Sequence, residues 1–295
     1  MRTTLQDLLA AGTPVVADGG MGTMLFSLGL AQGDSPELWN VDHPDRIRSV
    51  HRGYIEAGAQ IILTNSFGGN RIRLGRHDLA GRAAELNAAA ARLARAEADA
   101  VPQPVVVGGS MGPTGQMLAP MGTLSFEEAV EAFAEQARAL VEGGVDVLWI
   151  ETMSDLEEVR AAHTACRQAA PDVPVVTTMT FDTKGRTMMG VTPERALSTL
   201  GEFGVIALGA NCGNGPDEIE GVIEKMNASG PAVPLISKAN AGLPRMVDGA
   251  AVYDATPEVM ADYARRVRAH GAQIIGACCG STPDHIRAIA QALKL

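Results

Sequence analysis

Short apolar runs recur along the chain, and each is followed by a stretch that carries the signals of a helix. There are eight such runs: Pro14–Asp18, Ile61–Phe67, Val105–Ser110, Val147–Thr152, Val175–Phe181, Ile206–Cys212, Pro234–Asn240 and Ile274–Gly280. The runs are continuously apolar rather than alternating, which is typical of parallel strands covered on both faces. The pattern therefore predicts eight strand–helix units in succession.

Residues that begin and end helices lie between these runs. Two pairs have the spacing of capping boxes, Ser125 with Glu128 and Ser154 with Glu157. Two further helix starts place a capping threonine before a proline, at Thr192-Pro193 and Thr256-Pro257. Glycines suited to a left-handed helix end precede four of the runs: Gly58, Gly144, Gly204 and Gly271. The Ala-rich segment Leu79–Ala100 predicts one long helix.

The eight units follow one another without a linker or a change of composition. We therefore expect a single domain over residues 1–295. A closed (β/α)8 TIM barrel is the simplest fold that arranges eight such units. An open, doubly wound sheet is the alternative that the same pattern allows.

Composition and charge say more about the possible binding partners than about the fold. The formal net charge of −10 argues against nucleic acid and against an anionic membrane surface. The N-terminal sequence lacks the apolar core of a signal peptide, and no stretch approaches the roughly 20 apolar residues of a membrane span. We expect a cytoplasmic protein, in which four cysteines do not form a disulfide framework.

Polar residues gather at the C-terminal ends of the expected strands, where TIM barrels build their active sites. The candidates are Asp18, Gly19, Thr64, Glu151, Asn211, Cys212, Cys278 and Cys279. Glu151 ends a very apolar run, where a buried carboxylate needs a partner such as a substrate ammonium group. For Asp18 and Glu151 the alternative is a structural role, as a helix cap or in an ion pair. No histidine lies at a strand end, so none is assigned a catalytic role.

Three of the four cysteines lie on the sixth and eighth expected strands, which are close neighbours around a barrel. Three thiolates with an open fourth position are typical of a catalytic zinc site, and sulfur ligands favour zinc or copper(I). Adjacent residues of a strand point to opposite faces, so Cys278 and Cys279 can share a metal only if the chain bends, as Gly280 allows. The alternatives are buried core thiols, as expected for Cys166, or a redox pair at Cys278 and Cys279.

Several segments together resemble the homocysteine S-methyltransferase family, which includes betaine–homocysteine methyltransferase and the N-terminal module of cobalamin-dependent methionine synthase. They are DGGMGT, NVDHPDRIRSVHRGYIEAGAQIILTNSFGGN, WIET, GANCG and GACCGSTPDHIRAIA, and they cover nearly the whole chain in order. The resemblance implies that Cys212, Cys278 and Cys279 bind zinc. It places the contacts to the amino-acid end of L-homocysteine on Asp18, Gly19, Thr64 and Glu151, and an orienting amide on Asn211.

The resemblance also implies the reaction. A free thiol has a pKa of about 8.5, and binding to zinc removes its proton. The zinc-bound thiolate of homocysteine would attack an activated methyl group and form methionine, without a general base. Whether the acceptor is homocysteine alone or also a close relative such as selenohomocysteine is left open.

The methyl donor is less defined. The aromatic residues that surround betaine in its family members fall on Gly68 and Thr152 here, which argues against that binding mode, and Trp39 is a remaining aromatic candidate. The sequence ends shortly after the last expected helix, so we expect no cobalamin domain in this chain and favour a separate corrinoid protein as donor, as in a split methionine synthase. The alternatives are a small onium donor (betaine, dimethylsulfoniopropionate or S-methylmethionine) and a non-catalytic barrel with a structural or redox-sensing metal site.

Overall fold

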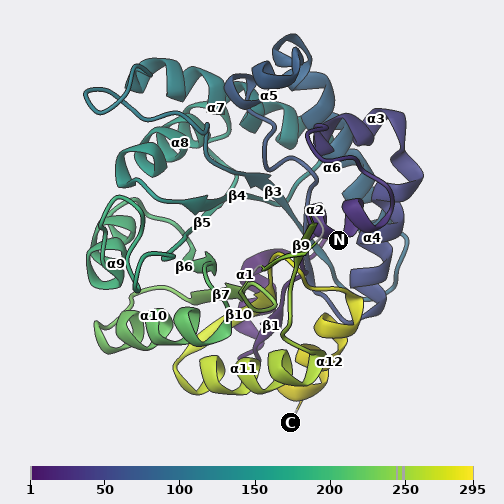
Figure 1. Cartoon of the computed structure of the whole chain (residues 1–295), viewed down its shortest axis with the longest axis vertical. Helices are drawn as coiled ribbons and strands as arrows, with labels where there is room; N and C mark the ends of the chain where they lie inside the picture. The colour runs from purple at the N-terminus through teal and green to yellow at the C-terminus, as the bar shows by residue number, and fades with distance from the viewer. Residues whose placement is uncertain (1, 244, 248–249, 295) are drawn as a thin grey trace.

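The computed structural model describes residues 2–243, 245–247 and 250–294. Eight parallel strands form the ring that Figure 1 shows end-on: β1 (Val15–Val16), β2 (Ile61–Leu63), β3 (Val106–Met111), β4 (Val147–Met153), β5 (Val175–Met179), β6 (Ala207–Cys212), β7 (Leu235–Ala239) and β10 (Ala272–Ala277). Hydrogen bonds join them in the order β1-β10-β7-β6-β5-β4-β3-β2. A parallel bridge between Ala17 and Ile61 closes the ring. The expected (β/α)8 barrel is confirmed, and the open sheet is excluded.

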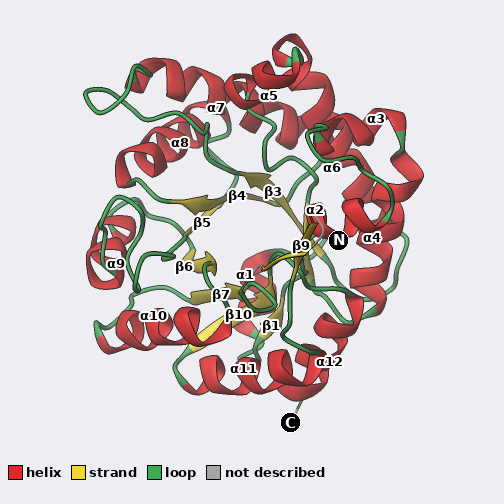
Figure 2. Ribbon diagram, viewed as in Figure 1, coloured by secondary structure: helices red, strands yellow, loops and turns green. Residues whose placement is uncertain are grey.

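One outer helix follows each strand of the ring, and Figure 2 shows these helices as the outer layer. They are α4 (Pro44–Glu56), α6 (Ala83–Asp99), α7 (Phe126–Gly143), α8 (Leu156–Ala169), α9 (Pro193–Gly201), α10 (Pro216–Ala228), α11 (Pro257–Ala269) and α12 (Pro283–Leu293). In the part of the chain that the structure describes, no helix combines the length and apolarity that crossing a membrane requires.

Shorter helices and strands are present in addition to the eight strands and eight outer helices of the barrel. They are α1 (Leu5–Ala10) before β1; α2 (Met21–Ser27), η1 (Pro36–Leu38) and α3 (Trp39–Asp42) before α4; and α5 (Arg71–Leu74), η2 (Gly75–His77) and η3 (Ala80–Arg82) before α6. An antiparallel hairpin of β8 (Arg245–Val247) and β9 (Ala250–Val252) lies between β7 and α11. Most of these elements follow the C-terminal end of a strand, so they surround that mouth of the barrel.

Most predicted helix boundaries are confirmed. Ser125 and Glu128 form a reciprocal capping box, and Thr192 and Thr256 cap helices that begin with proline. The four glycines expected at helix ends all have positive φ: Gly58, Gly144, Gly204 and Gly271.

Two boundary predictions are wrong. The cap of α8 is Asp155 rather than Ser154, because the Asp155 side chain accepts a hydrogen bond from the amide of Glu157. The long Ala-rich helix begins at Ala83 rather than Leu79, because residues 80–82 form a separate 3-10 turn.

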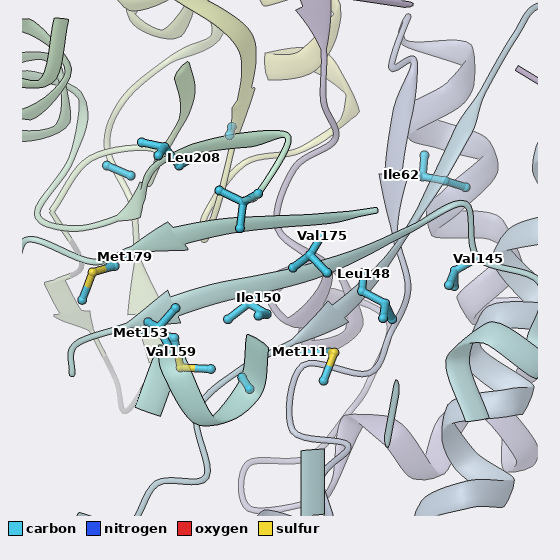
Figure 3. Close-up of a cluster of buried hydrophobic side chains, with 14 of the residues drawn as sticks. Ile62, Met111, Val145, Leu148, Ile150, Met153, Val159, Val175, Met179 and Leu208 are labelled. Atoms are coloured by element: carbon cyan, nitrogen blue, oxygen red, sulfur yellow. The ribbon is translucent and has the colours of Figure 1, made fainter. Parts of the chain in front are cut away.

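Strand alternation divides the core into two layers. In β4, Val147 and Trp149 belong to the cluster that fills the inside of the barrel, to which α1 adds Leu5 and Leu8. The neighbouring Leu148 and Ile150 belong to the larger cluster between strands and outer helices, part of which Figure 3 shows. Because side chains alternate along a strand, the next inward position of β4 after Trp149 is Glu151.

Candidate active site

Five successive strands each place one polar side chain on the inside of the barrel, directly beyond its apolar inner core. They are Ser110 on β3, Glu151 on β4, Thr178 on β5, Asn211 on β6 and Lys238 on β7, and all five are buried. Each follows an inward position by two residues, as Lys238 follows Ile236. This polar layer forms the floor of the candidate site.

Glu151 is held within this layer by two neutral donors. Ser110 Oγ donates to Glu151 Oε1 at 2.5 Å, and Asn211 Nδ2 lies 3.4 Å from Oε2. Burial raises the pKa of Glu151 to about 7, and the positive charge of Lys238 limits the rise. The carboxyl group therefore changes its ionisation close to neutral pH.

Asp18 forms a buried ion pair with Lys238. Lys238 Nζ donates to Asp18 Oδ1 at 2.7 Å, and the backbone amide of Leu63 donates to Oδ2 at 2.7 Å. Burial alone would lower the pKa of Lys238, but the charges of Asp18 and Glu151 outweigh it and the pKa is raised. Lys238 is therefore an ammonium ion at neutral pH.

Three thiols meet beside the polar layer. The Sγ atoms of Cys212, Cys278 and Cys279 all lie within 4.8 Å of one another, and those of Cys212 and Cys278 are 2.8 Å apart. β10 ends at Ala277, and Gly280 has a φ of +80°, so the two adjacent cysteines lie in a turn rather than in a strand. The bend expected at Gly280 is therefore present, and all three cysteines are free thiols.

The three thiols influence one another. Hydrogen bonds with Cys212 and Cys278 hold the pKa of Cys279 well below its usual value, while hydrogen bonds with Cys278 and Cys279 raise the pKa of Cys212. Cys166 differs: it is buried in the outer core, and burial raises its pKa to about 12. Cys166 is thus the inert core thiol that the sequence predicts.

The turn after β1 adds a backbone donor and is tied to the last strand. The amides of Asp18 and Thr64 donate to Ile61 and Gly108 within the sheet, whereas Gly19 makes no backbone hydrogen bond among the described residues. The amide of Gly20 donates to Ser281 Oγ at 3.0 Å. A Cβ atom at Gly19 would lie 2.4 Å from the same Ser281 oxygen, so this position requires glycine.

A cavity of about 420 Å³ opens from the polar layer and the thiols toward the surface. Its outer part is lined by Met21, Phe26, Glu37, Phe67, Arg73 and His77. The Arg73 guanidinium lies 5.1 Å from the centroid of the Phe67 ring, and Glu37 accepts a hydrogen bond from the amide of Gly68. A Cβ atom at Gly68 would lie 2.8 Å from Glu37 and 3.2 Å from Arg73, so a larger side chain there would have to displace these two side chains.

Comparison with known proteins decides the family. The model of the family described as homocysteine S-methyltransferase matches residues 15–293. The chain belongs to the homocysteine S-methyltransferase family.

The relatives of this homocysteine S-methyltransferase family member include two methionine synthases. The chain is 34% identical over 293 residues to that of Mycobacterium leprae (strain TN) and 33% identical over 305 residues to that of Mycobacterium tuberculosis (strain ATCC 25618 / H37Rv). These matches cover 95% and 99% of this chain, but only 24% and 25% of the two relatives. The chain thus spans about a quarter of the length of these relatives.

Solved structures agree with this assignment. The metallated form of the homocysteine methyltransferase MmuM from Escherichia coli superposes with a TM-score of 0.82 at 26% identity, covering 97% of this chain and 99% of that one. Its oxidized form gives a TM-score of 0.83 at 25% identity, with coverage of 98% and 99%.

The structure brings together every site residue that the sequence suggests. Asp18, Gly19, Thr64, Glu151 and the three clustered cysteines line one cavity, and Asn211 lies beneath it. Sequence reasoning missed Ser110, Lys238, Arg73 and His77 as further lining residues. Ser110 and Lys238 could have been found by continuing the inward alternation of β3 and β7. Trp39 packs beneath Arg46 and does not line the cavity.

Proposed function

We propose that this chain is a zinc-dependent homocysteine S-methyltransferase that forms methionine, with residues 1–295 acting as one homocysteine-binding domain. The observation that carries the proposal is the meeting of Cys212, Cys278 and Cys279 at the inner end of a cavity. The same cavity holds a buried carboxyl group at Glu151 and, at Gly19, a backbone amide that has no hydrogen-bond partner among the described residues.

The three thiols fit zinc in number and in spacing. Tetrahedral zinc with Zn–S bonds of about 2.3 Å separates its sulfur ligands by about 3.8 Å. All three Sγ atoms lie within 4.8 Å of one another, so the cluster needs only a small adjustment, chiefly a separation of Cys212 from Cys278. Three protein ligands leave a fourth position, which is the arrangement of a catalytic site.

When bound there, zinc would lower the pKa of a substrate thiol and hold it as a thiolate. The remaining contribution of the chain is orientation. Glu151 would receive the ammonium group of homocysteine, and the amide of Gly19 would donate to its carboxylate. Asn211 would fix Glu151 relative to Cys212, and Thr64 and Asp18 would complete the pocket. Such positioning of a nucleophile supplies much of the rate enhancement of a transfer reaction.

For the methyl donor we favour a corrinoid protein, as in a split cobalamin-dependent methionine synthase. Of the twelve large apolar side chains that are exposed in the described residues, eleven lie in connections after β1, β3, β5 or β7, around the mouth of the barrel. They include Phe26, Met117, Met121, Met188 and Met246. Exposed apolar side chains at a site entrance favour contact with a macromolecule, and methionine adapts readily to a partner surface.

A small onium compound is the second candidate donor. The rings of Phe26 and Phe67 line the cavity and can stabilise a cation. Against the betaine binding mode, Arg73 and Glu37 fill the space beside Gly68, where that mode requires an aromatic ring. Betaine, dimethylsulfoniopropionate and S-methylmethionine can be compared directly with a methylated corrinoid protein in a methionine-formation assay.

X-ray absorption at the zinc edge tests the central proposal. We expect one zinc per chain with three sulfur ligands, and four sulfur ligands after L-homocysteine is added. A sulfur count that does not respond to homocysteine would favour the non-catalytic alternative, a structural or redox-sensing metal site. Absence of zinc from reduced protein would contradict the assignment of the three cysteines as metal ligands.

A further inference from the structure

The ion pair between Lys238 and Asp18 is almost completely buried at the floor of the cavity. The side chains of Lys238 and Asp18 are only 2% and 3% exposed, although both line the cavity. Removing two charges from water is unfavourable unless each finds strong partners. A buried pair at the floor of a substrate cavity therefore calls for a functional explanation.

The partners of Asp18 leave it little capacity to bind a second cation. Its Oδ1 accepts from Lys238 and its Oδ2 accepts from the amide of Leu63, both at 2.7 Å. The positive charge of Lys238 cancels that of Asp18. Glu151 differs, because its two hydrogen-bond partners, Ser110 and Asn211, are both uncharged, and Lys238 acts on it through its charge without a hydrogen bond.

We infer that Lys238 is a positioning residue that neutralises Asp18 and so leaves Glu151 as the carboxylate that receives the ammonium group of the substrate. This inference rests on the proposed function, since it concerns how homocysteine is held. It assigns Asp18 an indirect role, in place of the direct contact that the family resemblance implies. The floor of the cavity then carries one net negative charge, which matches one ammonium group.

Loss of Asp18 alone and loss of both Asp18 and Lys238 should affect homocysteine binding differently. Without Asp18, the ammonium group of Lys238 would turn to the remaining carboxylate, Glu151, and compete with the substrate. Without both Asp18 and Lys238, Glu151 would again be the single charge of the floor. The double variant should therefore bind homocysteine better than the variant that lacks Asp18 alone.

Calorimetric binding of L-homocysteine to zinc-loaded protein tests this prediction with Asp18→Asn, Lys238→Met and the double variant. We expect Asp18→Asn to weaken binding at least about tenfold, and Lys238→Met added to it to restore binding to within about threefold of the original protein, a coupling that only interacting residues show. A double variant that binds as weakly as Asp18→Asn, or more weakly, would overturn the inference, because Asp18 or Lys238 would then contact the substrate itself.

A second ligand makes the Asp18→Asn variant informative on its own. 4-Mercaptobutanoate lacks the ammonium group, so its binding should be unchanged by Asp18→Asn within about threefold, whereas a general disturbance would weaken both ligands equally. Such equal weakening would also overturn the inference. Lys225→Met, at an exposed position of α10, is the matched control for loss of a lysine charge. Failure of the unaltered zinc-loaded protein to bind homocysteine would instead refute the proposed function.

Discussion

Thr152 and Cys212 adopt the same left-handed backbone conformation near the ends of β4 and β6, with φ of 61° in both. This conformation is uncommon for residues with a side chain and marks stored strain at functional sites. Asn211 stabilises the pair: its Oδ1 accepts from the Thr152 amide at 2.9 Å, and its Nδ2 donates to Thr152 Oγ1 at 2.6 Å. One buried amide thus fixes the turn that presents Cys212.

Replacing this amide should loosen the metal site. We expect Asn211→Ala to lower the free energy of unfolding by about 2–3 kcal/mol, since buried partners lose their hydrogen bonds. Zinc affinity should fall about tenfold or more, as for other groups that support metal ligands. Thermal unfolding and competition with a zinc chelator measure the two effects, and Asn227→Ala on the exposed end of α10 is the control. Unchanged zinc affinity would show that Asn211 does not orient Cys212.

Cys279 and Cys166 provide a matched pair for metal binding. Cys279→Ser should abolish stoichiometric zinc and the activity, because two thiolates and a hydroxyl hold zinc poorly. Cys166→Ala should retain one zinc per chain while the melting temperature falls, because this thiol is buried between Met111 and the outer helices. Metal analysis and thermal unfolding separate the two results. Equal loss of zinc from both variants would contradict the assignment of ligands.

The pKa of Glu151 predicts how homocysteine binding depends on pH. Burial raises this pKa to about 7, and only the ionised carboxylate attracts an ammonium group. The affinity for homocysteine relative to 4-mercaptobutanoate should therefore be constant above pH 7, as long as the amino group of the ligand stays protonated, and fall about tenfold per unit below pH 7. The comparison cancels the ionisation of the thiol, which both ligands share.

Glu151→Gln is the control for this pH dependence. The amide cannot ionise, so the ratio of the two affinities should be low and independent of pH. If the original protein also shows a constant ratio between pH 5 and 9, Glu151 does not receive the ammonium group. Calorimetry on zinc-loaded protein measures both ligands under the same conditions.

Replacing Gly280 or Gly190 by alanine separates the effect of a steric clash from the effect of backbone strain alone. Their φ values are +80° and +78°, but a Cβ atom at Gly280 would lie 2.1 Å from Tyr253 Cγ, whereas one at Gly190 would meet nothing within 4 Å. Gly190→Ala should cost about 1–2 kcal/mol of stability and leave zinc bound. Gly280→Ala should cost more and weaken zinc binding, because Cys278 and Cys279 would shift. Equal effects in unfolding and metal assays would contradict this account.

The sequence was sufficient to predict the barrel and the cysteine cluster, because both depend on patterns that repeat. Eight apolar runs with polar ends specify eight parallel strands, and the sixth and eighth of these runs contain Cys212, Cys278 and Cys279. Ser110 ends its run but is a small neutral residue that marks no particular chemistry, and Lys238 lies two positions before the end of its run, so neither was singled out. The ion pair of Lys238 with Asp18 joins residues 220 positions apart, which no local pattern reveals.

Local backbone geometry also could not be predicted from the sequence. Nothing in the sequence indicates a left-handed conformation at Thr152 or Cys212, since neither residue favours it. Asp155 caps α8 in place of Ser154: both residue types can serve, and only the hydrogen bond that Asp155 accepts from the Glu157 amide distinguishes them. Such details depend on packing around the barrel mouth rather than on local preference.

The hydrogen bond from Gly20 to Ser281 joins the first strand–helix connection to the last, across 261 positions of the sequence. A growing chain reaches Cys278 and Cys279 only after the other seven strands have been synthesised, and β10 must join β1 and β7 before these thiols can meet Cys212. The proposed zinc would therefore not nucleate the fold, as zinc does in small zinc domains. Metal loading would instead follow closure of the barrel, so the three thiols could bind a metal together only after all eight strands had been synthesised.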